Sequence, residues 1–211
     1  MRKLVIIGAG SVGGHIASNL ELYGIEGQLL GFLDDDVNKQ GKDFCGYPVI
    51  AGISWIFDKT DLDVIIGIAF PKVKEKIIKK LAVNGSLKYP SLVAENAWLS
   101  RATMLGKGTI IYPGTCVNYG SVIGDFVVMN MNCSIGHDCH VSSFSSFAPG
   151  VNLGGHTQVG LAVELGIGAA TLQGISIGNY SIVGGQSIVN KALPENVVAM
   201  GIPARIKSHI G

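Results

Sequence analysis

A six-residue periodicity runs without interruption through the second half of the chain. Every sixth residue from Val93 to Val189 gives 17 positions, and 16 of them are apolar, the exception being Thr171. The residue four places later is usually small or β-branched, as at Thr109 and Ser145. Strict periodicity over almost half of the chain is the sequence signature of a solenoid, and a period of six predicts a parallel β-helix.

The repeat also predicts where each side chain lies. Each hexad supplies a short strand and a turn, and three hexads (3 × 6 = 18 residues) close one triangular coil. The apolar and the small residue should point inward and stack along the axis, with coils spaced about 4.8 Å apart. Glycine often follows the apolar residue, as at Gly124 and Gly136, and it lets the chain turn where a Cβ would crowd it.

Charge is distributed unevenly along the chain. Residues 1–92 hold 11 of the 16 Lys and Arg residues, and no Lys or Arg occurs between Gly108 and Asn190. We therefore predict a domain of residues 1–92 and a second of residues 93–211. The nearly uncharged outer faces of the second domain would form a large apolar surface. Burial in a closed homo-oligomer removes that surface, and a three-sided prism favours a homotrimer.

The overall composition argues against several partners. A net charge of +1 gives no electrostatic reason to expect nucleic acid or a membrane surface. No apolar run approaches the roughly 20 residues that a membrane span needs. The run after Arg2 and Lys3 breaks at Gly8, which favours a first strand over a signal peptide. Together with only four cysteines, this predicts reduced thiols and a cytoplasmic protein.

The first half is typical of a nucleotide-binding α/β unit. The segment LVIIGAGSVGG predicts a buried strand, a glycine turn and a helix start, and Gly8, Gly10 and Gly13 satisfy the spacing G-x-G-x-x-G around Ser11. A second strand over residues 28–34 ends at Asp34 and Asp35. A third strand over residues 63–69 precedes a basic helix from residue 71 to about 84.

Two interpretations of this glycine turn stay open. The functional one is a phosphate on the helix N-terminus, with Asp34 or Asp35 on a ribose hydroxyl. The other is a tight βα turn with no ligand. A unit of about 90 residues has no second half for a nicotinamide, so a mononucleotide or nucleotide-sugar fits better than a dehydrogenase cofactor. Lysines of the basic helix, Lys74 among them, could attract phosphates or form a solvated face.

The segment CSIGHDCH resembles a metal cluster until the six-residue phase is applied. Cys133 and Cys139 then occupy the small inward position and should act as small hydrophobic residues. His137 and Asp138 lie on a corner and should point outward, as should His140 from its strand. Because the thiols and imidazoles point to opposite sides of one wall, they cannot converge on a zinc ion.

Residues 18 positions apart should be neighbours on one edge of the prism. His137 should therefore stack between Tyr119 and Gly155 with Gln173 beyond, and Asp138 between Gly120 and His156 with Gly174 beyond. A histidine–carboxylate pair flanked by glycines leaves room for a ligand and exposes backbone N–H groups, which predicts a functional site. An ordinary polar corner is the alternative. His156 is either a partner of Asp138 or a plain surface residue.

The motifs VIIGAGSVGG, GFLDDD, SIGHDC and MGIPARI together resemble the NeuD/PglD-like group of sialic-acid O-acetyltransferases and UDP-amino-sugar N-acetyltransferases. The resemblance covers essentially the whole chain. It implies a left-handed β-helix, an obligate trimer, acetyl-CoA as donor and active sites between neighbouring subunits.

The resemblance also implies roles for particular residues. His137 would be the general base, oriented by Asp138, with the N–H of Gly155 facing the thioester oxygen. The expected coenzyme-binding set is Gly155, His156, Gln173, Gly174, Gly201, Pro203, Ala204 and Arg205. The expected substrate-binding set is Gly8, Gly10, Ser11, Gly13, Asp34, Asp35 and Lys74. Two positions depart from the group: Ser146 stands where a second histidine is usual, and Lys74 aligns with a frequent arginine.

Four functions are weighed on these grounds. The first is acetyl-CoA-dependent N-acetylation of a UDP-linked amino sugar in surface glycan biosynthesis. The second is O-acetylation of sialic acid or a related sugar hydroxyl by the same base. The third is a zinc-dependent hydratase on the same scaffold, although no metal is expected because Asp138 and the GIPAR segment favour acyl transfer. The fourth is a non-catalytic nucleotide sensor.

Overall fold

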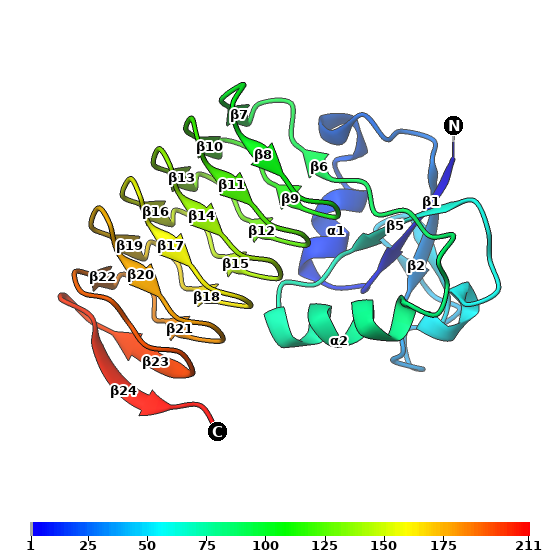
Figure 1. Ribbon diagram of the computed structural model, residues 1–211. Coiled ribbons are helices and arrows are strands. Elements are labelled where there is room, and N and C mark those ends of the chain that lie inside the picture. Colours follow the sequence, from blue (N-terminus) through cyan, green and yellow to red (C-terminus); the bar gives the residue numbers. More distant parts are fainter. Residues whose placement is uncertain (1) are drawn as a thin grey trace. The chain divides into compact units, whose positions relative to one another are not determined.

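The computed structural model describes residues 2–211, which form two compact units (Figure 1). The first unit comprises Val73–Pro90 together with the residues up to Ala69. The second comprises Phe70–Lys72 and Ser91–Gly211. The chain passes from the first unit to the second for the last time between Pro90 and Ser91. This point lies next to the change in charge composition.

The first unit is built around a five-stranded sheet in the order β3-β4-β2-β1-β5. β1 pairs in parallel with β2 and β5, and β4 adds in parallel to β2. Ile6, Phe32 and Val64 are completely buried, as expected of strands covered on both faces. The strands are β1 (Lys3–Ile7), β2 (Leu29–Leu33), β3 (Asp43–Phe44), β4 (Tyr47–Ala51) and β5 (Leu62–Ile66).

Helical segments connect these strands. They are α1 (Ser11–Ala17), the 3-10 helices η1 (Leu20–Tyr23) and η2 (Ile53–Ile56), and α2 (Pro71–Leu81). The predicted third strand and basic helix are both present but shorter than expected. α2 ends at Leu81 because Asn84 instead donates its side-chain amide to the carbonyls of Ile56 and Lys59.

The hairpin β3–β4 is absent from the sequence-based prediction. Its turn is made by Cys45 and Gly46, whose φ angles of 50° and 79° are both left-handed. Two left-handed residues match the twist of a tight hairpin, but cysteine is an unusual residue to adopt that conformation. The sequence of this turn therefore lacks the residue pairs, such as Asn-Gly, from which tight hairpins are usually predicted.

The second unit is the predicted parallel β-helix, of the left-handed type. Its 17 two-residue strands form three sheets, and Figure 1 shows the coils as successive layers. Partners lie 18 residues apart, for example Val117 beside Ile135. One sheet contains β7 (Trp98–Leu99), β10 (Cys116–Val117), β13 (Ser134–Ile135), β16 (Asn152–Leu153), β19 (Ala170–Thr171) and β22 (Ile188–Val189).

The second sheet contains β8 (Met104–Leu105), β11 (Val122–Ile123), β14 (His140–Val141), β17 (Gln158–Val159) and β20 (Ser176–Ile177). The third contains β6 (Leu92–Val93), β9 (Ile110–Ile111), β12 (Val128–Met129), β15 (Ser146–Phe147), β18 (Glu164–Leu165) and β21 (Ile182–Val183). It continues into β23 (Val197–Met200) and the antiparallel β24 (Arg205–His209).

The interior of the β-helix holds the two side-chain classes predicted from the repeat. The apolar residue of each hexad is the second residue of its strand, and Val117, Val141 and Val183 are fully buried. The hydroxyl at the small position forms hydrogen bonds with the neighbouring coil. Thr115 Oγ1 donates to the carbonyl of Asn130 at 2.9 Å and accepts the N–H of Cys133 at 3.3 Å. These hydroxyls satisfy backbone groups that the short strands leave unpaired.

Glycines close the corners by close approach between coils. A Cβ on Gly124 would lie 2.6 Å from the nitrogen of Ser143, and one on Gly136 would lie 2.6 Å from the nitrogen of Gly155. The same corners also take a left-handed residue two places after the glycine, such as Phe126 with a φ of 56°. The predicted role of glycine at the corners is confirmed at these positions.

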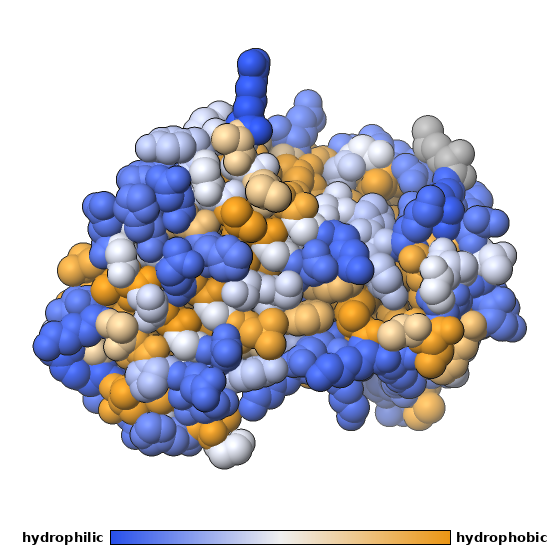
Figure 2. All heavy atoms as spheres, in the orientation of Figure 1, coloured by the Kyte–Doolittle hydropathy of each residue, from blue (hydrophilic) through white to orange (hydrophobic). Residues whose placement is uncertain are grey.

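Much of the outer surface of the β-helix is apolar. Figure 2 shows orange, apolar patches over the coils. Large exposed side chains include Trp98, Met104, Ile167 and Leu172. Among residues 2–211, no helix is both long and apolar enough to cross a membrane.

Candidate active site

One edge of the β-helix carries the histidine–carboxylate pair. At this corner Asp138 and His156 adopt left-handed φ angles of 54° and 59°, and glycines take the same place one coil to either side. The N–H of Asp138 donates to the carbonyl of Tyr119, and the N–H of His156 donates to that of His137, both at 2.9 Å. The edge therefore has the neighbours that a period of 18 predicts.

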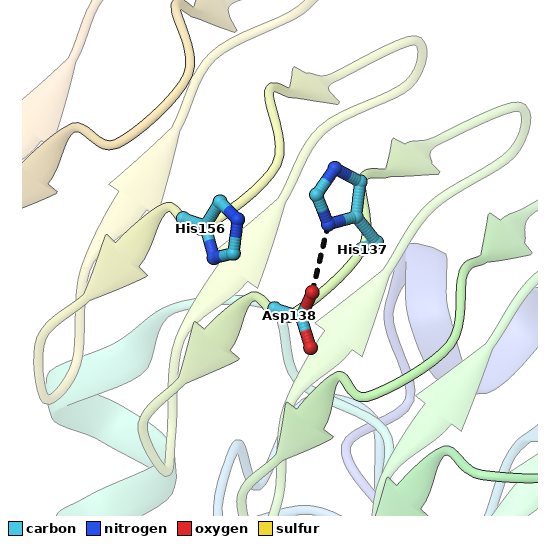
Figure 3. Close-up of side chains that lie close together, drawn as sticks. All are labelled: His137, Asp138 and His156. Atoms are coloured by element: carbon cyan, nitrogen blue, oxygen red, sulfur yellow. Dashed lines mark hydrogen bonds and ion pairs between the residues drawn. The ribbon is translucent and has the colours of Figure 1, made fainter.

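His137 and Asp138 form a hydrogen-bonded pair. Nδ1 of His137 lies 2.8 Å from Oδ2 of Asp138, and Figure 3 shows the contact. The side chains are 35% and 39% exposed, so both reach solvent from the corner. Because a carboxylate only accepts hydrogen bonds, the neutral imidazole carries its proton on Nδ1. The lone pair of Nε2 is then available to accept a proton.

The backbone of Gly155 lies against one face of this imidazole. A Cβ on Gly155 would lie 2.6 Å from Nε2 of His137 and 3.0 Å from Cδ2. Only glycine leaves the ring where it is, although the φ of this residue needs no glycine. The ring of His137 thus packs closely on a stretch of backbone that has no side chain.

His156 lies beside the pair on the next coil. Its ring meets that of His137 edge to face, with centroids 4.8 Å apart, and its side chain is exposed (Figure 3). One ligand atom from each of His137, Asp138 and His156 lies within 4.8 Å of the others, so these three could hold a metal ion. The contact between Nδ1 and Oδ2 already engages one of these possible ligand atoms in His137 and one in Asp138.

The cysteines of the CSIGHDCH segment are part of the core. Cys133 and Cys139 are each 1% exposed, and all four cysteines of the chain are free. Burial raises the pKa of the Cys133 thiol to about 11, and burial also raises that of Cys139. Their predicted inward orientation is confirmed, and neither thiol is available as a thiolate at neutral pH.

The remaining residues expected at the coenzyme lie further along the β-helix. Gln173 and Gly174 continue the edge on the coil after Gly155, and the N–H of Gly174 donates to the carbonyl of Gly155 at 2.8 Å. Gly201 to Ala204 connect β23 to β24, with a cis bond before Pro203, and Arg205 begins β24. Ala204 is buried in this turn, whereas Gly201, Pro203 and Arg205 are exposed. Ser146, at the position of the missing histidine, is a buried residue of β15.

A second candidate site lies in the first unit at the carboxyl ends of its strands. A pocket of about 450 Å³ is bordered by Gly8, Asp34 and Asp35, with Lys76 and Lys80 from α2. Its walls are otherwise apolar and include Ile7, Leu33, Ile53, Ile68, Val73 and Ile77. Oδ1 of Asp35 accepts the N–H of Ile53 at 2.7 Å, and Oδ2 lies 3.4 Å from Nζ of Lys80. Parallel strands commonly place ligands at this edge.

The glycines of the turn have different roles. Gly8 needs its φ of 103°, and a Cβ on Gly13 would overlap the carbonyl oxygen of Gly8. A Cβ on Gly10, in contrast, would meet nothing within 4 Å. Ser11 begins a helix of only seven residues. The first and third glycines are thus explained by the tight turn, whereas open space borders the second.

Asp34 is engaged by a lysine that the sequence analysis missed. Its Oδ2 accepts the N–H of Ala9 at 3.0 Å and lies 2.9 Å from Nζ of Lys39, which also donates to the carbonyl of Ala9. Partial burial opposes ionisation, but hydrogen bonds from the backbone of Asp36, from Lys39 and from Ala9 lower the pKa of Asp34 below its usual value. Lys39 lies in a loop between strands, and no motif singled it out.

Lys74 requires a correction. Its side chain is 0% exposed, so it is neither on a solvated face nor on the border of the pocket. α2 is amphipathic, and in the α-helical period Lys74 falls on the buried side together with Ile77 and Leu81. Lys76 and Lys80 are the lysines that reach the pocket with Asp34 and Asp35.

Similar proteins support the identification of both units. Residues 3–81 match the family described as the PglD N-terminal domain. The acetyltransferase domain of PglB from Neisseria gonorrhoeae, solved with acetyl coenzyme A, is 28% identical with a TM-score of 0.90 and covers 97% of this chain and 98% of that chain. Perosamine N-acetyltransferase from Caulobacter crescentus, solved as a His-to-Asn variant with CoA and GDP-perosamine, is 26% identical with a TM-score of 0.88, over 98% of this chain and 97% of that one.

Among curated relatives, GDP-perosamine N-acetyltransferase of Escherichia coli O157:H7 is 28% identical over an alignment of 149 positions, and the match covers 66% of this chain and 65% of that protein. The chain therefore spans slightly less than two thirds of this relative. The fold, the repeat and these matches define a β-helix protein with a PglD-type N-terminal domain. The predicted resemblance to the NeuD/PglD-like group of hexapeptide-repeat acetyltransferases is confirmed.

Proposed function

We propose that this protein is an acetyl-CoA-dependent acetyltransferase that N-acetylates a nucleotide-linked amino sugar in surface glycan biosynthesis. The observation that carries the proposal is the His137–Asp138 pair, with Nε2 of His137 held over the side-chain-free backbone of Gly155. A base of this kind suits proton removal from an attacking amine. Relatives named for perosamine N-acetylation support the amine as acceptor.

The geometry suggests the order of proton and bond changes. Nε2 of His137 accepts a proton from the sugar amine while the nitrogen attacks the thioester carbonyl. Asp138 holds the opposite ring nitrogen and stabilises the imidazolium that forms. The N–H of Gly155 donates to the oxyanion of the tetrahedral intermediate. Collapse breaks the carbon–sulfur bond, and the imidazolium returns the proton to the departing CoA thiolate.

The coenzyme would lie along the same edge of the β-helix. We assign its thioester end to Gly155 and His156 and its extended arm to Gln173 and Gly174. Gly201, Pro203, Ala204 and Arg205 would contact its nucleotide, since an exposed arginine suits a phosphate. Acetyl coenzyme A in the PglB domain supports the choice of donor. No metal takes part in this scheme.

The acceptor's nucleotide would occupy the pocket of the first unit. Asp34 and Asp35 would contact the ribose or the base, and Gly8, Gly10, Ser11 and Gly13 would line the diphosphate. We replace Lys74 with Lys76 and Lys80 in this site, because Lys74 is buried. The resemblance carried by the sequence motifs favours a UDP-linked sugar, whereas two relatives described with GDP-perosamine favour a guanosine nucleotide.

A homotrimer is the assembly that we propose. Its support is the exposed apolar surface of the β-helix, which includes Trp98, Met104 and Ile167. Three-fold packing would bury that surface and bring a neighbour to each edge. Four free cysteines fit a reducing compartment, so we assign the reaction to the cytoplasm.

The test is release of free thiol from acetyl-CoA across a panel of acceptors. The panel contains UDP-linked and GDP-linked 4-amino sugars, a UDP-linked 3-amino sugar, CMP-sialic acid and free sialic acid. We expect release with one nucleotide-linked amino sugar, and its loss in His137→Ala with acetyl-CoA binding retained. Release only with the sialic acids would instead assign O-acetylation, and a His137→Ala variant with full activity would refute the role of the base.

Two further measurements test the remaining candidate functions, a zinc-dependent hydratase and a nucleotide sensor. Metal analysis of protein purified without chelator tests for a zinc-dependent hydratase. A stoichiometric zinc ion whose removal abolishes function would contradict the acetyl-transfer scheme above. A nucleotide sensor would bind nucleotide sugar and release no thiol with any acceptor. We expect dialysis against a chelator to leave the rate of thiol release unchanged.

A further inference from the structure

An aromatic ring on the preceding coil stacks on one face of the proposed base. The ring of Tyr119, one coil before His137, lies parallel to the imidazole with centroids 5.5 Å apart and planes 12° apart. On the following coil the equivalent residue is Gly155, which has no side chain. The imidazole of His137 is thus packed by a ring on one face and by the backbone of Gly155 on the other.

The surroundings of this stack differ from those of a second one in the β-helix. Phe126 and Phe144 stack with the same centroid distance, 5.5 Å, and a 9° angle, but Phe126 is 2% exposed and the pair is hydrocarbon only. Tyr119 remains 54% exposed, and its partner can become a cation. Packing alone explains the phenylalanines, whereas the tyrosine covers little core.

The backbone holds Tyr119 in place. Its N–H donates to Oδ1 of Asn118 at 2.8 Å, and its carbonyl accepts the N–H of Asp138 at 2.9 Å. The tyrosine and the carboxylate that orients His137 are therefore linked through one backbone hydrogen bond. The register of the coils therefore places the backbone of Tyr119 beside that of His137 and Asp138.

We propose that Tyr119 is a positioning residue for His137: its ring face holds the imidazole against the backbone of Gly155 and stabilises the imidazolium formed when the base takes a proton. This inference rests on the proposed function, because it assumes that His137 is protonated during the reaction. A cation over the face of a tyrosine ring within about 6 Å is attracted by the negative face of the ring.

The groups that face His137 all bear on its charge. Asp138 contacts Nδ1, Tyr119 covers one face and His156 meets the ring edge to face. Asp138 and Tyr119 both favour the imidazolium. His156 is itself titratable, so the measurements compare variants of Tyr119 in an unchanged background of Asp138 and His156.

The experiment is the pH profile of kcat for Tyr119→Leu, Tyr119→Gln and Tyr119→Phe. Leu and Gln remove the ring face, and we expect kcat to fall between about 2-fold and 30-fold with the KM for acetyl-CoA unchanged. We expect the acidic limb of the profile to move to lower pH by roughly 0.4 to 1.5 units, because the imidazolium is less stabilised. Phe retains the ring and should keep both values.

Tyr180→Leu is the matched control, since it removes a tyrosine from a different edge of the β-helix. It should leave kcat and the acidic limb as in the wild type. Gln provides the test if Leu disturbs the fold, because residue 119 is exposed. If Tyr119→Leu and Tyr119→Gln both keep the wild-type kcat and the wild-type acidic limb, the proposal is overturned. An equal loss of kcat in Tyr119→Phe would also overturn it. A lower kcat with an unmoved limb would overturn the stabilisation of the imidazolium.

The stack can also be measured without any acceptor. The imidazole carbon shifts of His137 against pH, followed by NMR in the protein alone, should titrate at lower pH in Tyr119→Leu than in the wild type. If that shift occurs and no acceptor supports acetyl transfer, the stack stands and the proposed function fails. If transfer occurs and the titration is unmoved, the proposed function stands and the inference fails.

Discussion

The two units of this protein satisfy their polar groups in different ways. In the β-helix one contact recurs: an inward hydroxyl, such as that of Thr115 or Ser145, bonds a carbonyl and an N–H of neighbouring coils. In the first unit each contact occurs once, as where Asp34 accepts from both Ala9 and Lys39. Repetition makes each β-helix position interpretable by register, whereas the α/β unit depends on individual partners.

The same difference separates the two candidate sites. The histidine–carboxylate pair projects from a corner whose left-handed residue recurs on four successive coils, at Gly120, Asp138, His156 and Gly174, so its position is set by the repeat. The pocket beside Gly8 is bordered by residues from four separate segments of the first unit. Changes in the β-helix should therefore have effects that register predicts, and changes in the first unit should depend on local partners.

Among variants that keep both His137 and Asp138, the largest effect is expected from Gly155→Ala. The added Cβ would lie 2.6 Å from Nε2 of His137 and would push the imidazole away from the reacting groups. Displacement of a base by about 1 Å can lower the rate about 100-fold, so we expect a loss of that order in kcat. Gly85→Ala is the control, because a Cβ there meets nothing within 4 Å. Equal kcat values for the two variants would contradict the geometry of the site.

A smaller effect, on stability, is expected from Thr115→Val. The substitution keeps the shape of the side chain but leaves the carbonyl of Asn130 and the N–H of Cys133 without the buried hydroxyl. We expect a loss of about 1–3 kcal/mol in the free energy of unfolding, measured by chemical denaturation. Thr103→Val should cost less, since its partly buried hydroxyl makes a 3.5 Å contact. A larger loss at Thr103 would refute the role of the inward hydroxyls.

In the first unit, Asp34→Asn tests a contact that occurs once. The folded state lowers the pKa of Asp34, so its stabilisation is fully present above the unfolded value of about 3.9 and is lost as the pH falls through the lowered value. We expect wild type to exceed Asp34→Asn by about 1 kcal/mol at pH 7 and the difference to vanish in acid. Asp36→Asn, an exposed neighbour, is the control. A difference that grows as the pH falls would contradict the sign.

The smallest effect is expected at the core cysteines. At pH 7.5, iodoacetamide should modify Cys45 and Cys116, which are exposed, and leave Cys133 and Cys139 unmodified until the protein unfolds. The raised pKa of the Cys133 thiol, about 11, and its burial both oppose reaction. Peptide mass spectrometry identifies the sites. Modification of Cys133 in the folded protein would refute its place in the core.

Register is the reason that the β-helix could be predicted from the sequence in detail. Because no residue is inserted from Val93 to Val189, counting by 6 and 18 gave the inward cysteines, the outward His140 and the neighbours of His137. Two features escaped that reasoning. Counting gives adjacency but not ring orientation, so neither the parallel stack on Tyr119 nor the close approach of Gly155 to Nε2 could be foreseen.

The first unit was predictable in outline only. Alternation of apolar strands and a glycine turn indicated β1, α1, β2 and β5, but the hairpin at Cys45 carries no common turn signal. The burial of Lys74 illustrates a second limit, because a lysine in a basic helix is normally solvated. Lys39 illustrates a third, since only the folded loop brings it to Asp34.

The most direct test of the account is a comparison of kcat and KM in His137→Asn and Asp35→Ala. If chemistry belongs to the β-helix and nucleotide binding to the first unit, His137→Asn lowers kcat by about 10²–10⁴ with the acceptor KM nearly unchanged. Asp35→Ala then raises the acceptor KM about tenfold or more with kcat nearly unchanged. Wild-type kcat in His137→Asn, or a loss in Asp35→Ala confined to kcat, would contradict this division between the two units.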